Sequence, residues 1–293
     1  MELTADGGAV VRTGLGPTGQ GHQTAMAMLV SERLGIPLDS VQVVHGDTDV
    51  VPQGVGTFGS RSLQVGGTAI DTAAERVVEK AHELAADHLE ASAADLRFEG
   101  GEFHVAGVPA KSVSWAALAA ALDGNGRLAE LAVEEEFKPE SPTWPFGTHV
   151  AVVEVDVETG LTKLIRMVCA DDCGTVLNPL LVEGQRHGGV AQGVAQAICE
   201  EFAYDDEANP VTDNFVTYPI VSAADLPAIE LVGLETPTPI NPLGAKGIGE
   251  SGTIGSTPAV HNAVIDALSH LGVRHVDMPA TPMRVWEAIQ AAR

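Results

Sequence analysis

The sequence predicts an α+β protein built from two α/β-type subdomains, residues 1–128 and 129–293. Predicted strands and helices alternate along the whole chain, and tight hairpins join some of the strands. This combination favours mixed sheets with packed helices over a single doubly wound parallel sheet. The length of 293 residues suffices for two ordinary domains. Because only 4% of the residues are aromatic, the core must consist of Ala, Val, Leu and Ile side chains.

In the first half, Gly-rich loops alternate with regular elements. Gly35 and Pro37 end the first predicted helix, and Gly100 and Gly101 mark the turn of a hairpin. The pattern predicts strands at residues 9–13 and 41–44, helices at about 23–34, 69–91 and 115–122, and a hairpin at 96–105.

The second half opens with strands and closes with helices. Glu158, Thr159 and Gly160 predict a tight connection between two of these strands. The predicted strands cover residues 131–137, 149–157, 161–170 and 229–234, and the predicted helices cover 181–200, 258–271 and 282–292.

The charge of the chain limits its partners. It has 16 Lys and Arg against 40 Asp and Glu, a formal net charge of -24. Such a surface repels phosphate backbones and anionic lipid headgroups, so we expect neither a nucleic acid nor a membrane partner. No apolar run approaches the length of a membrane span, and residues 1–20 lack the pattern of a signal peptide. We expect a cytoplasmic protein.

Cysteine and histidine spacing gives no sign of a metal site built from protein side chains. Cys169, Cys173 and Cys199 form no CxxC pair, and the histidines lack HxxxH or HExxH spacing. We expect reduced thiols, with Cys173 as a packed thiol rather than a nucleophile, and His187 packed or solvated.

The first Gly-rich loop, residues 14–24, joins a strand to a helix. Glycines let backbone N–H groups approach a ligand, and a helix N-terminus carries partial positive charge. The loop suits a phosphate or diphosphate, although a tight turn would use the same residues. Gly14, Gly16 and Gly19 also fit the GxGxxG motif, with Asp47 after the next strand. A nicotinamide-dependent dehydrogenase therefore stays open as an alternative.

Three later segments also precede helices. Residues 56–62 add hydroxyl groups and Arg61, which suits a phosphate or carboxylate fork but could equally be solvated. Asn178 and Pro179 predict a capped helix start. In residues 241–252, Glu250 lies among four glycines with Lys246 as the nearby cation. We expect this carboxylate to be partly buried and suited to accept a proton, unless it merely complements a helix dipole.

Together and in this order, these segments resemble one family, the molybdenum hydroxylases, which includes xanthine dehydrogenase, aldehyde oxidase and the large subunit of aerobic carbon monoxide dehydrogenase. The resemblance is to the C-terminal molybdopterin-binding portion of the large subunit and runs from about Ala9 to the final helix. It implies a molybdenum-dependent oxidoreductase that hydroxylates an aldehyde, N-heterocycle or similar molecule, or oxidises carbon monoxide. The matching motifs are residues 19–22, 56–61, 173–185 and 244–250.

The resemblance also implies roles for single residues. Backbone donors and amides would hold a molybdopterin, expected as the cytosine dinucleotide, whose dithiolene binds the molybdenum. Glu250 matches the family's active-site glutamate, the base beside the metal. The implied cofactor-binding residues are Gly19, Gln20, Gly21, His22, Thr24, Gly59, Ser60, Arg61, Ser62, Cys173, Asn178, Gln185, Lys246, Gly247 and Gly249.

Compared with a complete large subunit of that family, which is more than twice as long, the sequence lacks the first cofactor-binding half. We therefore expect a partner chain that carries this half, together with a 2Fe-2S subunit, an FAD subunit and a small-molecule substrate. The isolated chain is expected to be inactive, and Met1 favours a separate gene product over a fragment. A non-catalytic assembly subunit of the same fold stays open, although Glu250 disfavours it.

Overall fold

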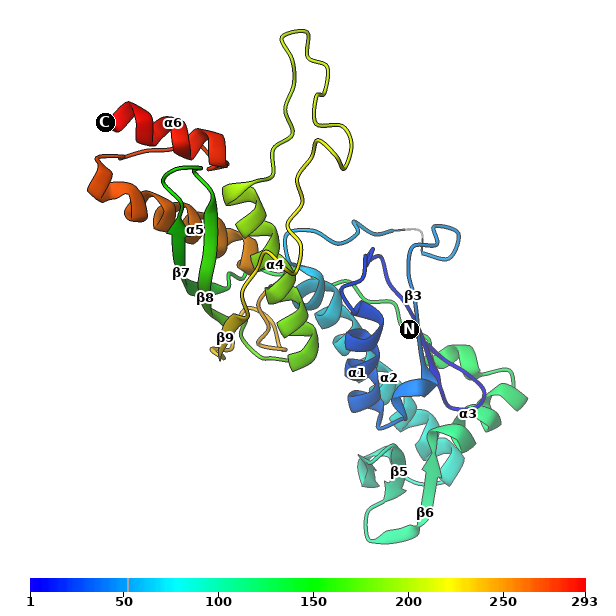
Figure 1. The fold of residues 1–293 in the computed structure, drawn as a ribbon. Helices are drawn as coiled ribbons and strands as arrows, with labels where there is room; N and C mark the ends of the chain where they lie inside the picture. Colours follow the sequence, from blue (N-terminus) through cyan, green and yellow to red (C-terminus); the bar gives the residue numbers. More distant parts are fainter. Residues whose placement is uncertain (52) are drawn as a thin grey trace. The chain divides into compact units, whose positions relative to one another are not determined.

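The computed structural model describes residues 1–51 and 53–293, and over these residues the chain divides into two compact units (Figure 1). Unit 1 comprises Met1–Thr143 and Pro239–Ala245, and unit 2 comprises Trp144–Thr238 and Lys246–Arg293. The mixed sheets and packed helices of both units confirm the predicted α+β class.

The division falls at residue 143, whereas the sequence predicts it near residue 128, because residues 129–143 pack on unit 1. Leu131 is fully buried, and the backbone N–H of Val133 donates to the Met1 carbonyl at 2.9 Å. The Lys80 ammonium donates to the carbonyl of Ala132 at 2.7 Å. The strand predicted at 131–137 is wrong: Leu128–Leu131 is a 3-10 turn and the following residues have no regular structure.

The first sheet of unit 1 has the order β1-β2-β3, with β1 antiparallel and β3 parallel to β2. Ala9 and Val11 of β2 are buried, and a helix leads from β2 toward β3. That helix, α1, ends at Gly35, whose φ of 62° is easy only for glycine. The bounds are β1 Glu2–Leu3, β2 Ala9–Arg12, α1 His22–Leu34, η1 Leu38–Ser40 and β3 Val41–Val44.

The rest of unit 1 packs a long helix against an antiparallel sheet of order β4-β5-β6. Phe103 and Trp115 meet edge to face at 5.0 Å, and the Trp115 indole donates to the Leu34 carbonyl at 2.6 Å, which ties α3 to α1. The π-helical turn and β6 were not predicted. The bounds are η2 Ser62–Gly67, α2 Thr68–Leu89, η3 Ala93–Asp95, β4 Leu96–Glu99, β5 Glu102–Val105, β6 Val108–Ser114, α3 Trp115–Gly124 and η4 Leu128–Leu131.

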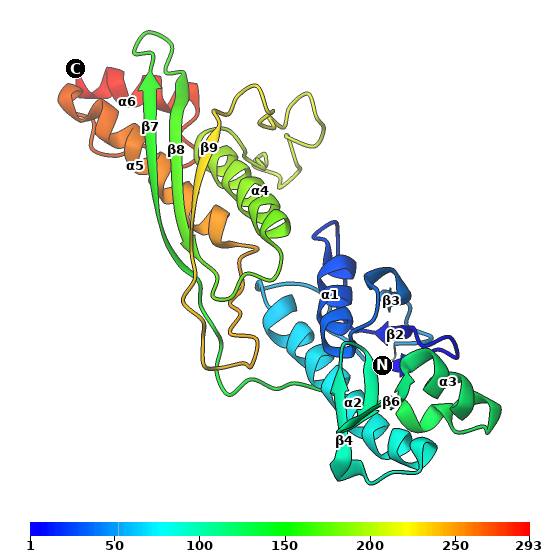
Figure 2. The same ribbon diagram turned by 90° about the horizontal axis from the view of Figure 1, so that it is seen from below.

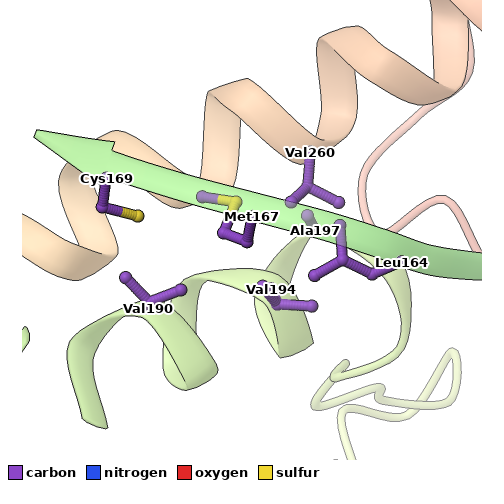
Figure 3. Close-up of a cluster of buried hydrophobic side chains, with 7 residues drawn as sticks. All are labelled: Leu164, Met167, Cys169, Val190, Val194, Ala197 and Val260. Atoms are coloured by element: carbon purple, nitrogen blue, oxygen red, sulfur yellow. The ribbon is translucent and has the colours of Figure 1, made fainter. Parts of the chain in front are cut away.

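Unit 2 has a sheet of order β7-β8-β9, with β7 antiparallel and β9 parallel to β8 (Figure 2). Side chains of β8, α4 and α5 meet in one buried cluster (Figure 3), which contains Leu164, Met167, Cys169, Val190, Val194, Ala197 and Val260. The bounds are β7 Phe146–Val155, β8 Thr162–Asp172, α4 Pro179–Ile198, β9 Ile229–Leu234, α5 Ser251–Leu268, η5 Ser269–Leu271 and α6 Pro282–Ala292.

Helix α5 begins seven residues before the position that the sequence predicts. Proline favours the first turn of a helix, which is why Pro258 suggested a start, but here it lies inside α5. The first two turns of α5 gain contacts with α4 instead: Thr253 Oγ1 donates to the Gly189 carbonyl at 2.9 Å, and Ser256 Oγ donates to the Val190 carbonyl at 3.3 Å. The earlier start places Glu250 at the N-cap of α5.

No helix within residues 1–51 and 53–293 combines the length and apolar character needed to cross a bilayer.

Candidate functional site

The first two Gly-rich loops lie against each other in unit 1. The Gly56 N–H donates to the Gly14 carbonyl at 3.1 Å, and the Gly16 N–H donates to Thr57 Oγ1 at 3.3 Å. A Cβ atom on Gly14 would collide with the backbone of Gly54. Segments 40 residues apart in the sequence are therefore joined through backbone atoms, and this close approach requires glycine.

The start of α1 fits an anionic ligand. Gly21 is its N-cap with a φ of 74°, and no side chain in the described part of the chain caps the helix. Gly19 has a φ of 88°, and a Cβ there would lie in open space. The Gln20 side-chain oxygen accepts a hydrogen bond from the Thr18 N–H, which holds the turn. Uncapped N–H groups and the helix dipole together favour a negative group at this end.

His22 is the first residue of α1. Burial, together with the neighbouring His45, lowers its pKa, so the ring is neutral near pH 7. Its Nδ1 atom is buried and has no hydrogen-bond partner among the described residues. Thr24, in the same turn, is exposed.

The second loop combines strained backbone with an aromatic–cation contact. Gly59 and Ser60 both have positive φ angles, of 59° and 53°. The Arg61 guanidinium lies over the exposed Phe58 ring, 5.2 Å from its centroid. Ser62 is buried and its hydroxyl donates to Thr57 Oγ1 at 3.2 Å, so its side chain stabilises the loop. Asp47 makes a local turn, because its carboxylate accepts from the Asp49 N–H at 3.0 Å.

In unit 2, four residues singled out by the sequence analysis lie just after β8 or on α4. Cys173 is buried, as expected for a packed thiol, and burial raises the pKa of its thiol. Asn178 caps α4 as predicted, accepting from the Leu181 N–H at 3.2 Å. Gln185 is half-buried on α4. His187 is solvated, with its ring on the Glu183 carbonyl at 2.9 Å.

The structure joins the segment of Glu250 to the end of β8. The Lys246 N–H donates to the Cys173 carbonyl at 2.8 Å, and the Lys246 ammonium pairs with Asp172 at 2.9 Å. Gly247 and Gly249 follow, and Glu250 ends the segment as the N-cap of α5. The expectation of a partly buried Glu250 is wrong for this chain, in which the residue is exposed.

Sequence reasoning missed a buried polar cluster beneath this segment. Asp171 accepts hydrogen bonds from Ser251 Oγ at 2.7 Å and Arg186 Nε at 2.9 Å, and its other neighbour is His149 Nε2 at 3.0 Å. The side chains of Asp171, Arg186 and His149 are at most 4% exposed. The sequence contained one signal for this cluster, namely two adjacent aspartates at the end of an apolar strand. Because aspartates are rarely buried without partners, this pair could have indicated buried and paired carboxylates.

The predicted site residues thus form two groups, one in each unit. Unit 1 contains residues 19–24 and 59–62, on two loops that are joined at Gly14, Gly16, Gly56 and Thr57. Unit 2 brings together Cys173, Lys246 and the segment that ends at Glu250. Among the described side chains, no group of three or more His, Cys, Asp or Glu has an arrangement that could hold a metal ion.

Known proteins are similar to this chain in sequence and in fold. The pattern of the molybdopterin cofactor-binding domain matches residues 1–227. The carbon monoxide dehydrogenase large chain of Hydrogenophaga pseudoflava is 39% identical over 295 residues, which cover 99% of this chain and 36% of the relative. Reconstituted carbon monoxide dehydrogenase from Oligotropha carboxidovorans superposes with a TM-score of 0.88 at 35% identity, and quinoline 2-oxidoreductase from Pseudomonas putida 86 with 0.87 at 37%.

Each of these structural matches covers 99% of this chain and 37% of the solved chain, so the sequence spans little more than a third of the length of its relatives. The domain pattern nevertheless covers most of the residues, and the likeness extends over nearly all of them in both sequence and structure. The chain therefore belongs to the molybdenum hydroxylase family and contains its molybdopterin cofactor-binding domain.

Proposed function

We propose that this chain forms part of the binding site for a molybdopterin, in its cytosine dinucleotide form, and supplies Glu250 as the proton acceptor of an oxidoreductase. The observation that carries the proposal is the Gly-rich start of α1, which fits an anionic ligand in a member of this family. The reaction class is oxidative hydroxylation of an aldehyde, an N-heterocycle or a similar molecule, or oxidation of carbon monoxide.

The residues of unit 1 fit such a cofactor. Gly19 and Gly59 leave open space where a Cβ would lie, so a ligand can approach their backbone closely. The N-terminus of α1 and the Arg61 guanidinium supply positive charge for a phosphate tail. Gln20 holds the turn at the helix start, and Ser62 holds the second loop. Recognition through backbone N–H groups suits a chain with a net charge of -24.

Unit 2 supplies the reacting carboxylate. When bound, the pterin-held molybdenum would supply the two-electron oxidation of the substrate. Glu250 stands at the N-cap of α5, exposed and at the end of a Gly-rich segment. Its part is to accept the proton that the reaction releases.

The length and the names of the relatives support a complex with further subunits. The matched relative is a large chain of which this chain covers 36%, and we propose a companion that carries the first cofactor-binding half. The relatives are named as large chains of dehydrogenases, which supports further subunits that carry 2Fe-2S and FAD groups and remove electrons. In this assignment the complex is cytoplasmic.

The test is co-expression of the chain with the companion that carries the missing half, followed by molybdenum and pterin analysis of the purified complex. We expect about one molybdenum and one pterin dinucleotide for each copy of the chain. Gln20→Ala should lower both contents, because the turn at the start of α1 loses its side-chain contact. A fully assembled complex without molybdenum would refute the proposed function.

A further inference from the structure

Two adjacent aspartates at the end of β8 contact the two ends of the segment that carries Glu250. Asp171 accepts from the hydroxyl of Ser251 at 2.7 Å, and Ser251 directly follows Glu250. Arg186 holds the other carboxylate oxygen of Asp171 at 2.9 Å and donates to the Cys169 and Val232 carbonyls at 2.6 and 2.9 Å. Through Arg186, the Asp171 carboxylate is therefore linked to α4 and to the backbones of β8 and β9.

Asp172 contacts the other end of the segment. Its Oδ1 atom accepts from the Lys246 ammonium at 2.9 Å and from the Gly174 N–H at 2.9 Å. Lys246 is further held by its backbone N–H on the Cys173 carbonyl and by the face of the Phe146 ring, 4.7 Å from its ammonium. Both members of this ion pair are buried, the lysine side chain at 9% exposure and the aspartate at 0%.

Two of the four residues between these two ends are glycines. Gly247 and Gly249 bring high backbone freedom to the segment, and free glycines lose much entropy when ordered. After Glu250, Gly252 lies so close to α4 that a Cβ on it would come within 2.7 Å of the Val190 nitrogen. The start of α5 thus has a fixed place, and the glycines are restrained from both ends.

We propose that Asp171 and Asp172 are positioning residues, which fix the place of Glu250 by anchoring Ser251 and Lys246. The proposal rests on the proposed function, because it assigns Glu250 a place that matters for proton transfer. A proton acceptor works only within hydrogen-bond reach of the proton it takes, and a displacement of about 1 Å can lower a rate by a factor of about 100. Paired buried charges give a stiffer anchor than exposed polar contacts would.

Ser251→Ala in the assembled complex tests the first anchor. It removes one hydroxyl and leaves Asp171 paired with Arg186 and close to His149. Ser256→Ala is the matched control, since Ser256 is a buried serine of the same helix whose hydroxyl contacts only the α4 backbone among the described residues. We expect Ser251→Ala to retain molybdenum and KM, to lower kcat about tenfold, and to increase amide hydrogen exchange over residues 246–251. Ser256→Ala should change neither kcat nor this exchange.

Lys246→Gln tests the second anchor, with the exposed Lys138→Gln as its control. We expect faster exchange over residues 246–251 and a lower kcat per bound molybdenum only for Lys246→Gln. Unchanged exchange over the segment in both Ser251→Ala and Lys246→Gln would overturn the proposal.

A double-mutant cycle with Glu250→Gln separates this inference from the proposed function. If the anchors act through Glu250, Ser251→Ala should not lower the residual kcat of Glu250→Gln any further. The same fold loss in both backgrounds would overturn the positioning role and leave the proposed function intact. Wild-type turnover in Glu250→Gln would instead refute the proposed function, while the exchange data would still report whether the anchors order the segment.

Discussion

The two units share one order of elements but hold their loops in different ways. Each has an antiparallel strand pair, a helix, a strand parallel to the second of the pair, a Gly-rich segment and a second helix. In unit 1 these are β1, β2, α1, β3 and α2, and in unit 2 they are β7, β8, α4, β9 and α5. In unit 1 backbone N–H groups and hydroxyls join the loops, whereas in unit 2 buried ion pairs hold the segment before α5.

This difference matches two separate tasks. Loops joined through glycine backbone atoms leave an uncapped helix start that suits a phosphate, and the Arg61 guanidinium adds positive charge. One carboxylate that must meet a reacting atom needs a fixed position, and Asp171 and Asp172 supply it through stiff contacts. Under the proposed function, the same order of elements therefore serves ligand binding in unit 1 and side-chain placement in unit 2.

Glu250→Gln is expected to have the largest effect on activity. The amide has nearly the shape of the carboxylate but cannot accept the proton, so kcat of the assembled complex should fall by about 100- to 10,000-fold. Molybdenum content should stay at the wild-type level, because Glu250 is not among the residues to which cofactor binding is assigned. Steady-state turnover and metal analysis of the same preparation check both points, and normal turnover would contradict the assignment of Glu250.

Arg186→Met should have the largest effect on stability. It leaves the buried Asp171 carboxylate without its cation, which costs about 3–5 kcal/mol. Arg166→Met is the control, since Arg166 forms an exposed pair with Glu230 in the same sheet and its loss should cost at most about 1 kcal/mol. Urea unfolding followed by circular dichroism measures both. Equal losses would show that the buried cluster adds no special stability.

Most regular elements could be predicted from the sequence because their signals are local. Gly35 and Pro37 after an apolar helix, and Asn178 with Pro179 before one, mark ends that the structure places within a residue or two. The strand at 131–137 was wrong because Leu131 and Val133 are apolar for a different reason, namely packing against unit 1.

The candidate site was only partly predictable for a similar reason. The Gly-rich loops are visible in the sequence, and so is Glu250, but their contacts depend on residues far away in the chain. Asp171 lies 80 residues from Ser251, and Asp172 lies 74 residues from Lys246. No local sequence pattern indicates a contact between residues this far apart in the chain. The contacts of Asp171 and Asp172 could therefore be identified only from the structure.

Gly14→Ala and Gly19→Ala should separate loop joining from ligand approach in unit 1. A Cβ on Gly14 meets the Gly54 backbone, so this variant should lose about 1–3 kcal/mol of stability. A Cβ on Gly19 meets no described atom within 4 Å, and its cost, about 1–2 kcal/mol, comes from the φ of 88°. Urea unfolding of each chain and molybdenum content of each complex should show Gly14→Ala as the less stable variant. Gly19→Ala should have the lower cofactor content relative to its stability, and the reverse order would contradict these roles.

The smallest expected effect is a shift in the acid dependence of stability. Burial alone would raise the pKa of Asp171, but the hydrogen bonds from His149 and Ser251 and the charge of Arg186 outweigh burial and lower it. A carboxyl group whose pKa is lower in the folded state stabilises the protein above its unfolded pKa of about 3.9, and this stability is lost as the pH falls through the folded value.

Ser251→Ala removes one donor and brings the folded pKa of Asp171 closer to the unfolded value. Its contribution to stability above about pH 4 should therefore shrink, and the loss of this contribution on acidification should be complete at a higher pH than in the wild type. The exposed carboxyl groups contribute equally to the pH dependence of stability in the Ser256→Ala control. The difference between the urea midpoints of the two variants from about pH 3 to pH 7 therefore reports the contribution of Asp171. Parallel curves for both variants would mean that Ser251 does not hold the Asp171 carboxylate in its charged form.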